Sequence, residues 1–143
     1  MILLDTTVLV YSTGLEHRFR APCRALIAAV ADGGLRATTT VEAIQEFVHV
    51  RSRRRDRREA ASLGADYAEL LAPLLLPSED DLRAGLALFG RTAGLGAFDA
   101  VLAATGLNVG VTALVSADAT FADVAGLPHI VPDDAGVAGL IPA

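Results

Sequence analysis

MILLD, residues 1–5, is the stretch of sequence that decides the fold, because a short apolar run ends there in a carboxylate. The same arrangement returns at residues 112–118, where the run TALVSAD also ends in an aspartate. Such runs predict short buried strands, and ligands of open α/β sheets bind at the carboxyl ends of the strands. We therefore expect Asp5 and Asp118 to face one crevice. Carboxylates that converge without neutralising bases repel one another unless a cation joins them, and Mg²⁺ and Mn²⁺ prefer such oxygen ligands.

Strand and helix patterns alternate along the rest of the chain. Apolar runs predict strands at residues 1–4, 35–39, 74–76, 112–116 and 129–131. Helical patterns occupy residues 6–12, 17–31, 40–53, 56–71, 78–92 and 98–107. A capping box of Ser78 and Asp81 is expected to start one of these helices, whereas Asp133 is expected in a solvated turn of a loosely structured, Gly- and Ala-rich tail. This order predicts an α/β fold with a central, mostly parallel, twisted sheet of four to five strands flanked by helices.

Composition narrows the function classes. The chain has 143 residues, which predicts a single domain over residues 1–143, and its 52% hydrophobic content predicts a large core or apolar surface for a partner. All twelve basic residues are Arg, which disfavours P-loop NTPases, receiver domains and haloacid-type phosphatases, because these need a Lys. The one cysteine, Cys23, excludes an internal disulfide and fits a cytoplasmic location. Glycines and Asp99 interrupt the apolar residues 92–117, so we expect no membrane span.

Four separate acids are the candidates for chemistry: Asp5, Glu46, Asp99 and Asp118. Asp5 can equally be the N-cap of the helix that follows, and Asp118 can be an ordinary turn residue. Glu46 borders the apolar half of its predicted helix, whereas Glu42 lies farther out on the polar face. Asp99 lies in the first turn of a helix that is apolar nearly all round, so we expect the helix to be buried and the charge of Asp99 to be costly or its pKa to be shifted. Helix capping or a metal or ligand site would each explain it.

Four short motifs contain these acids in order: ILLDTTVLVY (residues 2–11), VEAIQEF (41–47), FDAVLAA (98–104) and LVSADATF (114–121). Together they resemble the motifs of a PIN-domain ribonuclease, in particular a VapC-type toxin of a type II toxin–antitoxin system. The resemblance covers nearly the whole chain and implies that Asp5, Glu46, Asp99 and Asp118 are the catalytic, metal-binding acids. Ser116 matches a recurrent Ser or Thr near the site. Thr7 stands where family members often have Asn, and its hydroxyl can still make a hydrogen bond in support of the metal ligands.

The resemblance implies an endoribonuclease that uses Mg²⁺ or Mn²⁺ as its cofactor. Clustered carboxylates hold one or two cations, which lower the pKa of a bound water and contact the phosphate oxygens during displacement. Attack by water leaves 5′-phosphate and 3′-hydroxyl ends. Attack by the RNA 2′-hydroxyl instead needs a His-type base, and only His49 lies beside one of the motifs. The resemblance also implies a homodimer and a small cognate antitoxin whose C-terminal segment occupies the active-site groove.

Half of the positive charge lies in eight positions directly after the predicted Glu46 helix, on Arg51, Arg53, Arg54, Arg55, Arg57 and Arg58. Arg suits phosphate groups and stacks on unpaired bases, so the first four are candidate RNA contacts. The alternatives are that these arginines form a solvated helix end or that they bind an acidic stretch of the antitoxin. A second, weaker basic stripe consists of Arg18, Arg20 and Arg24.

The sequence is compatible with two other functions. One is a PIN-type nuclease that processes RNA or DNA outside a toxin–antitoxin system, because a fold does not settle the substrate. The other is a binding module with a relict metal site, whose acids only cap helices and face solvent. A small-molecule hydrolase is disfavoured, since neither a Gly-x-Ser-x-Gly elbow nor a Gly-x-Gly-x-x-Gly loop occurs.

Overall fold

A four-stranded parallel sheet lies at the centre of the computed structural model, which describes residues 1–143. The strand order is β2–β1–β3–β4, and every neighbouring pair is parallel. The strands are short: β1 (Ile2–Leu4), β2 (Ala37–Thr38), β3 (Leu114–Val115) and β4 (His129–Ile130). The predicted α/β fold with a parallel sheet flanked by helices is confirmed, with four strands.

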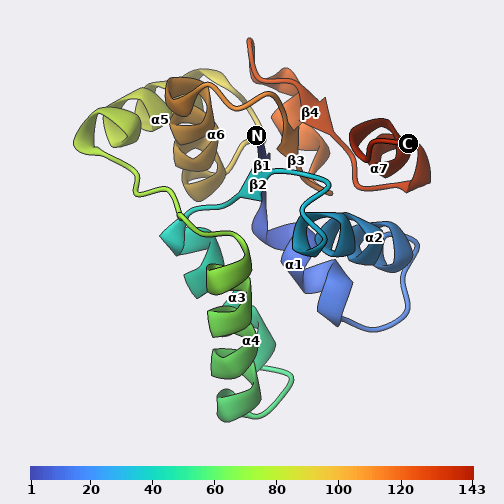
Figure 1. Ribbon diagram of the computed structural model, residues 1–143. Helices are drawn as coiled ribbons and strands as arrows, with labels where there is room; N and C mark the ends of the chain where they lie inside the picture. Colours follow the sequence, from blue (N-terminus) through green and yellow to red (C-terminus); the bar gives the residue numbers. More distant parts are fainter.

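Seven α-helices and one 3₁₀ helix surround the sheet (Figure 1). They are α1 (Thr6–Thr13), α2 (Arg20–Ala31), α3 (Val41–Ser52), α4 (Arg57–Leu70), α5 (Glu79–Arg91), α6 (Ala97–Val109), η1 (Ala119–Asp123) and α7 (Asp134–Leu140). Helices α5 and α6 lie on one side of the sheet and α1, α2 and α7 on the other, while α3 and α4 form a hairpin that projects away from it. All six predicted helices are present. No helix combines the length and the apolar composition that crossing a bilayer requires.

Alternation along β1 divides the core into two layers. Ile2 and Leu4 belong to a cluster with buried residues of α1, α2, α4 and α7, whereas Leu3 belongs to a cluster with residues of α5 and α6. All three side chains are buried. Because both faces of the sheet are covered, its strands are continuous apolar runs, which is why MILLD predicts a central parallel strand.

The segment at residues 74–76 is not a strand, so this prediction is wrong. Leu75 makes only an isolated bridge with Thr40, and its backbone N–H donates to Thr39 O at 2.9 Å. Pro73 and Pro77 flank the segment and lack backbone N–H groups. Pairing therefore ends after a single residue.

The C-terminal segment is helical, which corrects the predicted loose tail. The Asp133 carboxylate accepts a hydrogen bond from Gly136 N at 2.8 Å, so Asp133 is the N-cap of α7 and not a residue of a solvated turn. Val137 is buried in the core cluster that contains α2 residues, and Leu140 packs against that cluster. Burial of these apolar side chains stabilises a helix that its glycines disfavour.

The predicted capping box is present at the start of α5. Ser78 Oγ accepts from Asp81 N at 3.1 Å, and the Asp81 carboxylate accepts from Ser78 N at 2.7 Å. The hydrogen bond from the Ser78 backbone lowers the pKa of Asp81. Asp81 also accepts a hydrogen bond from Asn108 Nδ2 at 3.0 Å, which ties the start of α5 to the end of α6.

Helices α5 and α6 pack most closely at Gly85. A Cβ atom at this position would lie 2.7 Å from Val101 Cα of α6, so the helices can approach this closely only because a glycine is present. Gly90, five residues later in α5, has open space where its Cβ would be. The two glycines of one helix therefore respond differently to the same substitution.

Gly85→Ala is expected to lower the free energy of unfolding by about 2 kcal/mol, because the added methyl group meets the backbone of α6. Gly90→Ala is the matched control and is expected to raise it by up to ~1 kcal/mol, since Ala favours a helix interior over Gly. Urea unfolding followed by circular dichroism measures both. Equal stability of the two variants would contradict the close packing of α5 on α6.

Candidate metal centre

The pairing of β1 with β3 brings Asp5 and Asp118 to one edge of the sheet. Leu4 pairs with Val115, and Asp5 N donates to Val115 O at 3.0 Å. Asp5 directly follows β1, and Asp118 lies three residues beyond the end of β3. Both aspartates are therefore at the carboxyl edge of the sheet, where the two apolar runs led us to expect them.

Asp5 is buried, with 4% of its surface exposed, and one of its carboxylate oxygens is fully engaged. Oδ2 accepts hydrogen bonds from Ser116 Oγ at 2.7 Å, from Thr7 Oγ1 at 2.8 Å and from Thr7 N at 3.4 Å. The last bond makes Asp5 the N-cap of α1, so the capping alternative holds as a local description. Oδ1 makes no hydrogen bond and is free to act as a ligand atom.

The hydroxyl groups of Thr7 and Ser116 join the ends of β1 and β3. Each donates to Asp5 and accepts a backbone N–H from the segment after β3: Thr7 Oγ1 from Ala117 N at 3.0 Å, and Ser116 Oγ from Asp118 N at 3.0 Å. The hydroxyl of Thr7 thus makes the hydrogen bond to Asp5 that the sequence led us to consider. These bonds fix the orientation of Asp5 and the path of the chain toward Asp118.

Glu46 extends from α3 toward the start of α1. Thr6, the first residue of α1, is buried, and its Oγ1 donates to Glu46 Oε2 at 2.8 Å while lying 3.4 Å from Ala43 O. Thr6 therefore orients Glu46, a role that sequence reasoning missed. Its place directly after Asp5 is the one signal that the sequence offers. Glu42, one turn earlier on α3, makes no such bond.

Asp118 caps the 3₁₀ helix η1. Its Oδ1 accepts hydrogen bonds from Thr120 N at 2.9 Å and from Thr120 Oγ1 at 2.7 Å. The turn-residue alternative is therefore correct as a description of the local backbone. The second carboxylate oxygen of Asp118 makes no hydrogen bond, so capping and metal binding use different atoms of the same group.

The pKa of Asp99 is raised by its burial and by the other three acids. Asp99 lies half-buried in the first turn of α6, and its pKa is raised from 3.8 to about 7. Burial is the largest cause, followed by the negative charges of Asp5, Asp118 and Glu46. Charges shift a pKa in this way only over distances of about 10 Å or less, so the other three acids lie near Asp99, and the four together make up the acid cluster. No Arg offsets the effect.

A groove with a volume of about 940 Å³ opens beside the cluster. Asp5, Glu46 and Asp99 line it together with apolar side chains that include Leu82 and Phe98. No arginine lines the groove. Phe98, directly before Asp99, is 83% exposed, so an aromatic ring lies at the rim of an otherwise acidic site.

The donor set fits a hard divalent cation. Three of the acids have one oxygen tied to the protein and one free, and Asp99 makes no hydrogen bond. Oxygen ligands of this kind suit Mg²⁺ and Mn²⁺. As the side chains stand, no three His, Cys, Asp or Glu residues converge tightly enough to hold a metal ion without adjustment.

Arg51 is not part of an open basic surface. Its side chain is 15% exposed, its Nη2 pairs with Glu59 Oε1 at 2.5 Å, and its Nη1 donates to Thr13 O at 3.1 Å. The guanidinium thus makes its contacts within the protein, which disfavours the RNA contact predicted for this residue.

The rest of the arginine cluster lies at the far end of the α3–α4 hairpin (Figure 1). Arg53, Arg54 and Arg55 are exposed there, beyond the residues that line the groove. Arg53 comes seven positions after Glu46, which along a helix is a rise of about 10 Å. The structure therefore keeps these arginines outside the acid cluster.

The second basic stripe is engaged in local contacts. Arg24 Nε donates to Ser12 O at 2.9 Å, Arg20 pairs with Glu16 at 2.8 Å, and the Arg18 guanidinium lies 4.5 Å from the centre of the Phe19 ring. These arginines support the connection between α1 and α2.

Asp99→Asn is expected to stabilise the metal-free protein at pH 8 and to leave its stability unchanged at pH 4. In the wild type, the folded state binds the Asp99 proton more tightly than the unfolded chain does, because its pKa is raised from 3.8 to about 7. The stability gained from this proton is complete below pH 3.8 and is lost as the pH rises through about 7, whereas Asn is neutral at every pH. With solvent screening of a half-buried group, we expect a gain of roughly 1 kcal/mol, or about 3 °C in Tm, at pH 8 in EDTA.

Thermal unfolding at the two pH values measures this effect, with the exposed Asp123→Asn as the matched control. A destabilised Asp99→Asn variant at pH 8 would show that the carboxylate is not under repulsion from its neighbours.

Comparisons with known proteins identify the family of the chain. The PIN domain family pattern matches residues 2–127. The chain is 55% identical over 142 residues to Ribonuclease VapC7 of Mycobacterium tuberculosis, across 99% of this chain and 98% of that protein. The crystal structure of VapBC2 from Rickettsia felis, bound to a DNA fragment from their promoter, has a TM-score of 0.72 at 15% identity, across 92% of this chain and 98% of that chain. The chain therefore belongs to the PIN-domain family, in its VapC branch.

Proposed function

We propose that this chain is a Mg²⁺- or Mn²⁺-dependent endoribonuclease and the toxin of a toxin–antitoxin pair. The observation that carries the proposal is the cluster of four carboxylates without a basic partner at the carboxyl edge of the sheet. The 55% identity to Ribonuclease VapC7 supports ribonuclease activity. An acidic cluster whose own charges repel is a poor structural device, but it is well suited to a divalent cation.

Asp5, Glu46, Asp99 and Asp118 would hold the cation. When bound, it supplies a Lewis acid that lowers the pKa of a water molecule and neutralises charge on the phosphate. The protein presents the free carboxylate oxygens at fixed positions, because Thr7 and Ser116 hold Asp5 and Thr6 holds Glu46. With a pKa of about 7, Asp99 is partly protonated at neutral pH, and it would lose this proton if a bound cation neutralised the neighbouring charges.

Hydrolysis by water is the reaction that this site supports, with 5′-phosphate and 3′-hydroxyl products. The alternative attack by the RNA 2′-hydroxyl needs a base such as His. His129 is hydrogen-bonded to Ser116 O at 2.9 Å, and His17 is stacked on Tyr11 at 4.4 Å between ring centres. His49 is the one histidine that lines the groove.

A single-stranded RNA segment fits the groove better than a duplex. Phe98 offers an exposed aromatic face next to Asp99, and unpaired bases stack on such rings. Because no arginine lines the groove, the cation would have to balance the phosphate at the reaction centre. The exposed Arg53, Arg54 and Arg55 are the proposed contacts of the RNA backbone outside the groove.

Protein partners form part of the proposal. Leu82, Leu86 and Phe89 lie on one face of α5 and are 46%, 52% and 47% exposed, which is typical of a surface that another protein covers. We propose a homodimer and a cognate antitoxin that inhibits the enzyme. A cytoplasmic location agrees with the single, buried and unpaired Cys23.

Purified protein incubated with total tRNA and rRNA is expected to release discrete fragments with 5′-phosphate ends in Mg²⁺ or Mn²⁺ and none in EDTA. Asp5→Asn removes the charge of the most firmly held acid, so it should lower the rate by about 100-fold or more. Asp66→Asn, an exposed acid on α4, is the matched control and should cleave at the wild-type rate.

Cleavage that survives both EDTA and Asp5→Asn would contradict a metal centre at this cluster. Expression of the wild-type chain without an antitoxin should arrest growth, and Asp5→Asn should relieve the arrest. Cleavage in vitro without growth arrest would point to a processing nuclease outside a toxin–antitoxin system.

A further inference from the structure

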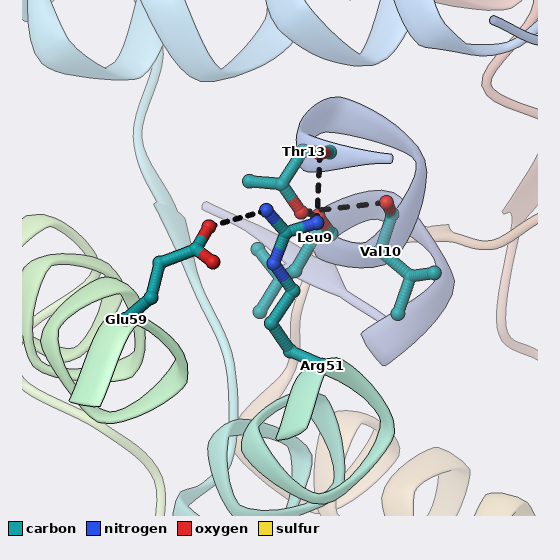
Figure 2. Close-up of polar contacts among 5 residues, drawn as sticks. All are labelled: Leu9, Val10, Thr13, Arg51 and Glu59. Atoms are coloured by element: carbon teal, nitrogen blue, oxygen red, sulfur yellow. Dashed lines mark hydrogen bonds and ion pairs between the residues drawn. The ribbon is translucent and has the colours of Figure 1, made fainter. Parts of the chain in front are cut away.

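Arg51 joins three helices at a point remote from the acids (Figure 2). Its side chain leaves α3, donates to Thr13 O at the end of α1 at 3.1 Å and pairs with Glu59 of α4 at 2.5 Å. Only 15% of the side chain is exposed, and its Nε is buried without a hydrogen-bond partner. A guanidinium in this setting is fixed within the fold, because moving it would break both contacts and leave more donors unpaired.

The same two helices, α1 and α3, also meet at the acid cluster. At the first residue of α1, Thr6 Oγ1 donates to Glu46 Oε2 of α3 at 2.8 Å. At the last residue of α1, Thr13 O accepts from Arg51 of α3. The two contacts are separated by about 10 Å along α1. Helices α1 and α3 are therefore linked at both ends of α1, with Glu46 at one link and Arg51 at the other.

The chemistry of the Arg51 contact suits a helix end. The last carbonyl groups of a helix lack partners within it, and a cation near them is favoured by the helix dipole. Arg24 of α2 donates to Ser12 O at 2.9 Å, and Thr13 Oγ1 donates to Leu9 O at 2.9 Å, so the end of α1 is fixed from several sides. Of the two arginines, only Arg51 comes from the helix that carries Glu46.

We propose that Arg51 is a positioning residue for Glu46. By binding the end of α1 it holds α3 in the register at which Glu46 meets Thr6, and it thereby sets the place of Glu46 in the acid cluster. Glu59 keeps the guanidinium in this orientation and neutralises its charge. The inference rests on the proposed function in one respect, which is that Glu46 binds the cation.

Steady-state cleavage of RNA and Mn²⁺ calorimetry test this role on Arg51→Gln. We expect kcat to fall about 10-fold and the Kd for Mn²⁺ to rise about 10-fold, as for other groups that orient a metal ligand, with KM for RNA unchanged. Arg51→Lys should recover part of kcat, because an ammonium group can still donate to Thr13 O. Arg36→Gln, an exposed arginine next to β2, is the matched control and should change none of the three values.

A rise in KM with unchanged kcat in Arg51→Gln would overturn the proposal and identify an RNA contact instead. Wild-type kcat and wild-type Mn²⁺ affinity in the folded variant would overturn it as well. Where Arg51→Gln fails to fold, Arg51→Lys decides in its place. Its kcat and Mn²⁺ affinity should lie below those of the wild type, because one ammonium group cannot keep both the Thr13 O and the Glu59 contacts. Wild-type values in the folded Lys variant would overturn the proposal.

The wild-type protein separates this inference from the proposed function. If the wild type neither cleaves RNA nor binds Mn²⁺, the proposed function fails, and the position of Glu46 is then read from backbone amide NMR shifts. The amide signals of Thr6 and Glu46 should move in Arg51→Gln and stay in place in Arg36→Gln. Unmoved signals in Arg51→Gln would overturn the positioning role without reference to metal or RNA.

Discussion

The parallel pairing of β1 with β3 is the constraint on which the acid cluster depends. With Leu4 opposite Val115, the chain leaves both strands in the same direction and at the same edge of the sheet. The strands are only two or three residues long, so each gives way almost at once to a helix whose N-cap is an aspartate, Asp5 for α1 and Asp118 for η1. In each aspartate one carboxylate oxygen makes the capping hydrogen bonds and the other makes none. Local folding and the site thus use the same two residues without competition.

The acids are oriented by neutral donors, which leave the negative charge of the cluster in place. Hydroxyl groups of Thr6, Thr7, Ser116 and Thr120 orient three of the acids. An arginine in their place would neutralise the charge that a cation needs, whereas a hydroxyl fixes a carboxylate and leaves its charge in place. Asp99 has no such donor, and burial together with the charges of the other three acids raises its pKa to about 7.

Much of the fold follows from local patterns that the sequence displays. Continuous apolar runs at residues 1–4 and 112–116 become the central strands because both faces of the sheet are covered, and the Ser78–Asp81 pattern starts α5. The pattern at residues 74–76 looks similar but forms no strand, since the flanking prolines end the pairing. Helix α7 could not be predicted, because its glycines disfavour a helix and its stability comes from burying Val137 against residues far away in the chain.

The candidate site, too, could be predicted only in part. The identity and order of the four acids are visible in the sequence, as is the presence of a hydroxyl at Thr7 and Ser116. The contacts that orient them are not, because Thr6 and Glu46 are 40 residues apart and Arg51 and Thr13 are 38 residues apart. A run of arginines looks the same in sequence whether its members face solvent or a helix end. The packing of α1 against α3 decides that Arg51 differs from Arg53.

Proton release on Mn²⁺ binding tests the central claim, that the four acids share one cation site, most directly. Calorimetric titrations at pH 6 in two buffers of different ionisation enthalpy give the number of protons released. With the pKa of Asp99 at about 7, binding should release close to one proton at pH 6 and far fewer at pH 8.5. Binding without proton release at pH 6 would place the cation away from Asp99. No binding would contradict a shared cation site, and the acids would then serve only in helix capping and in contacts within the protein.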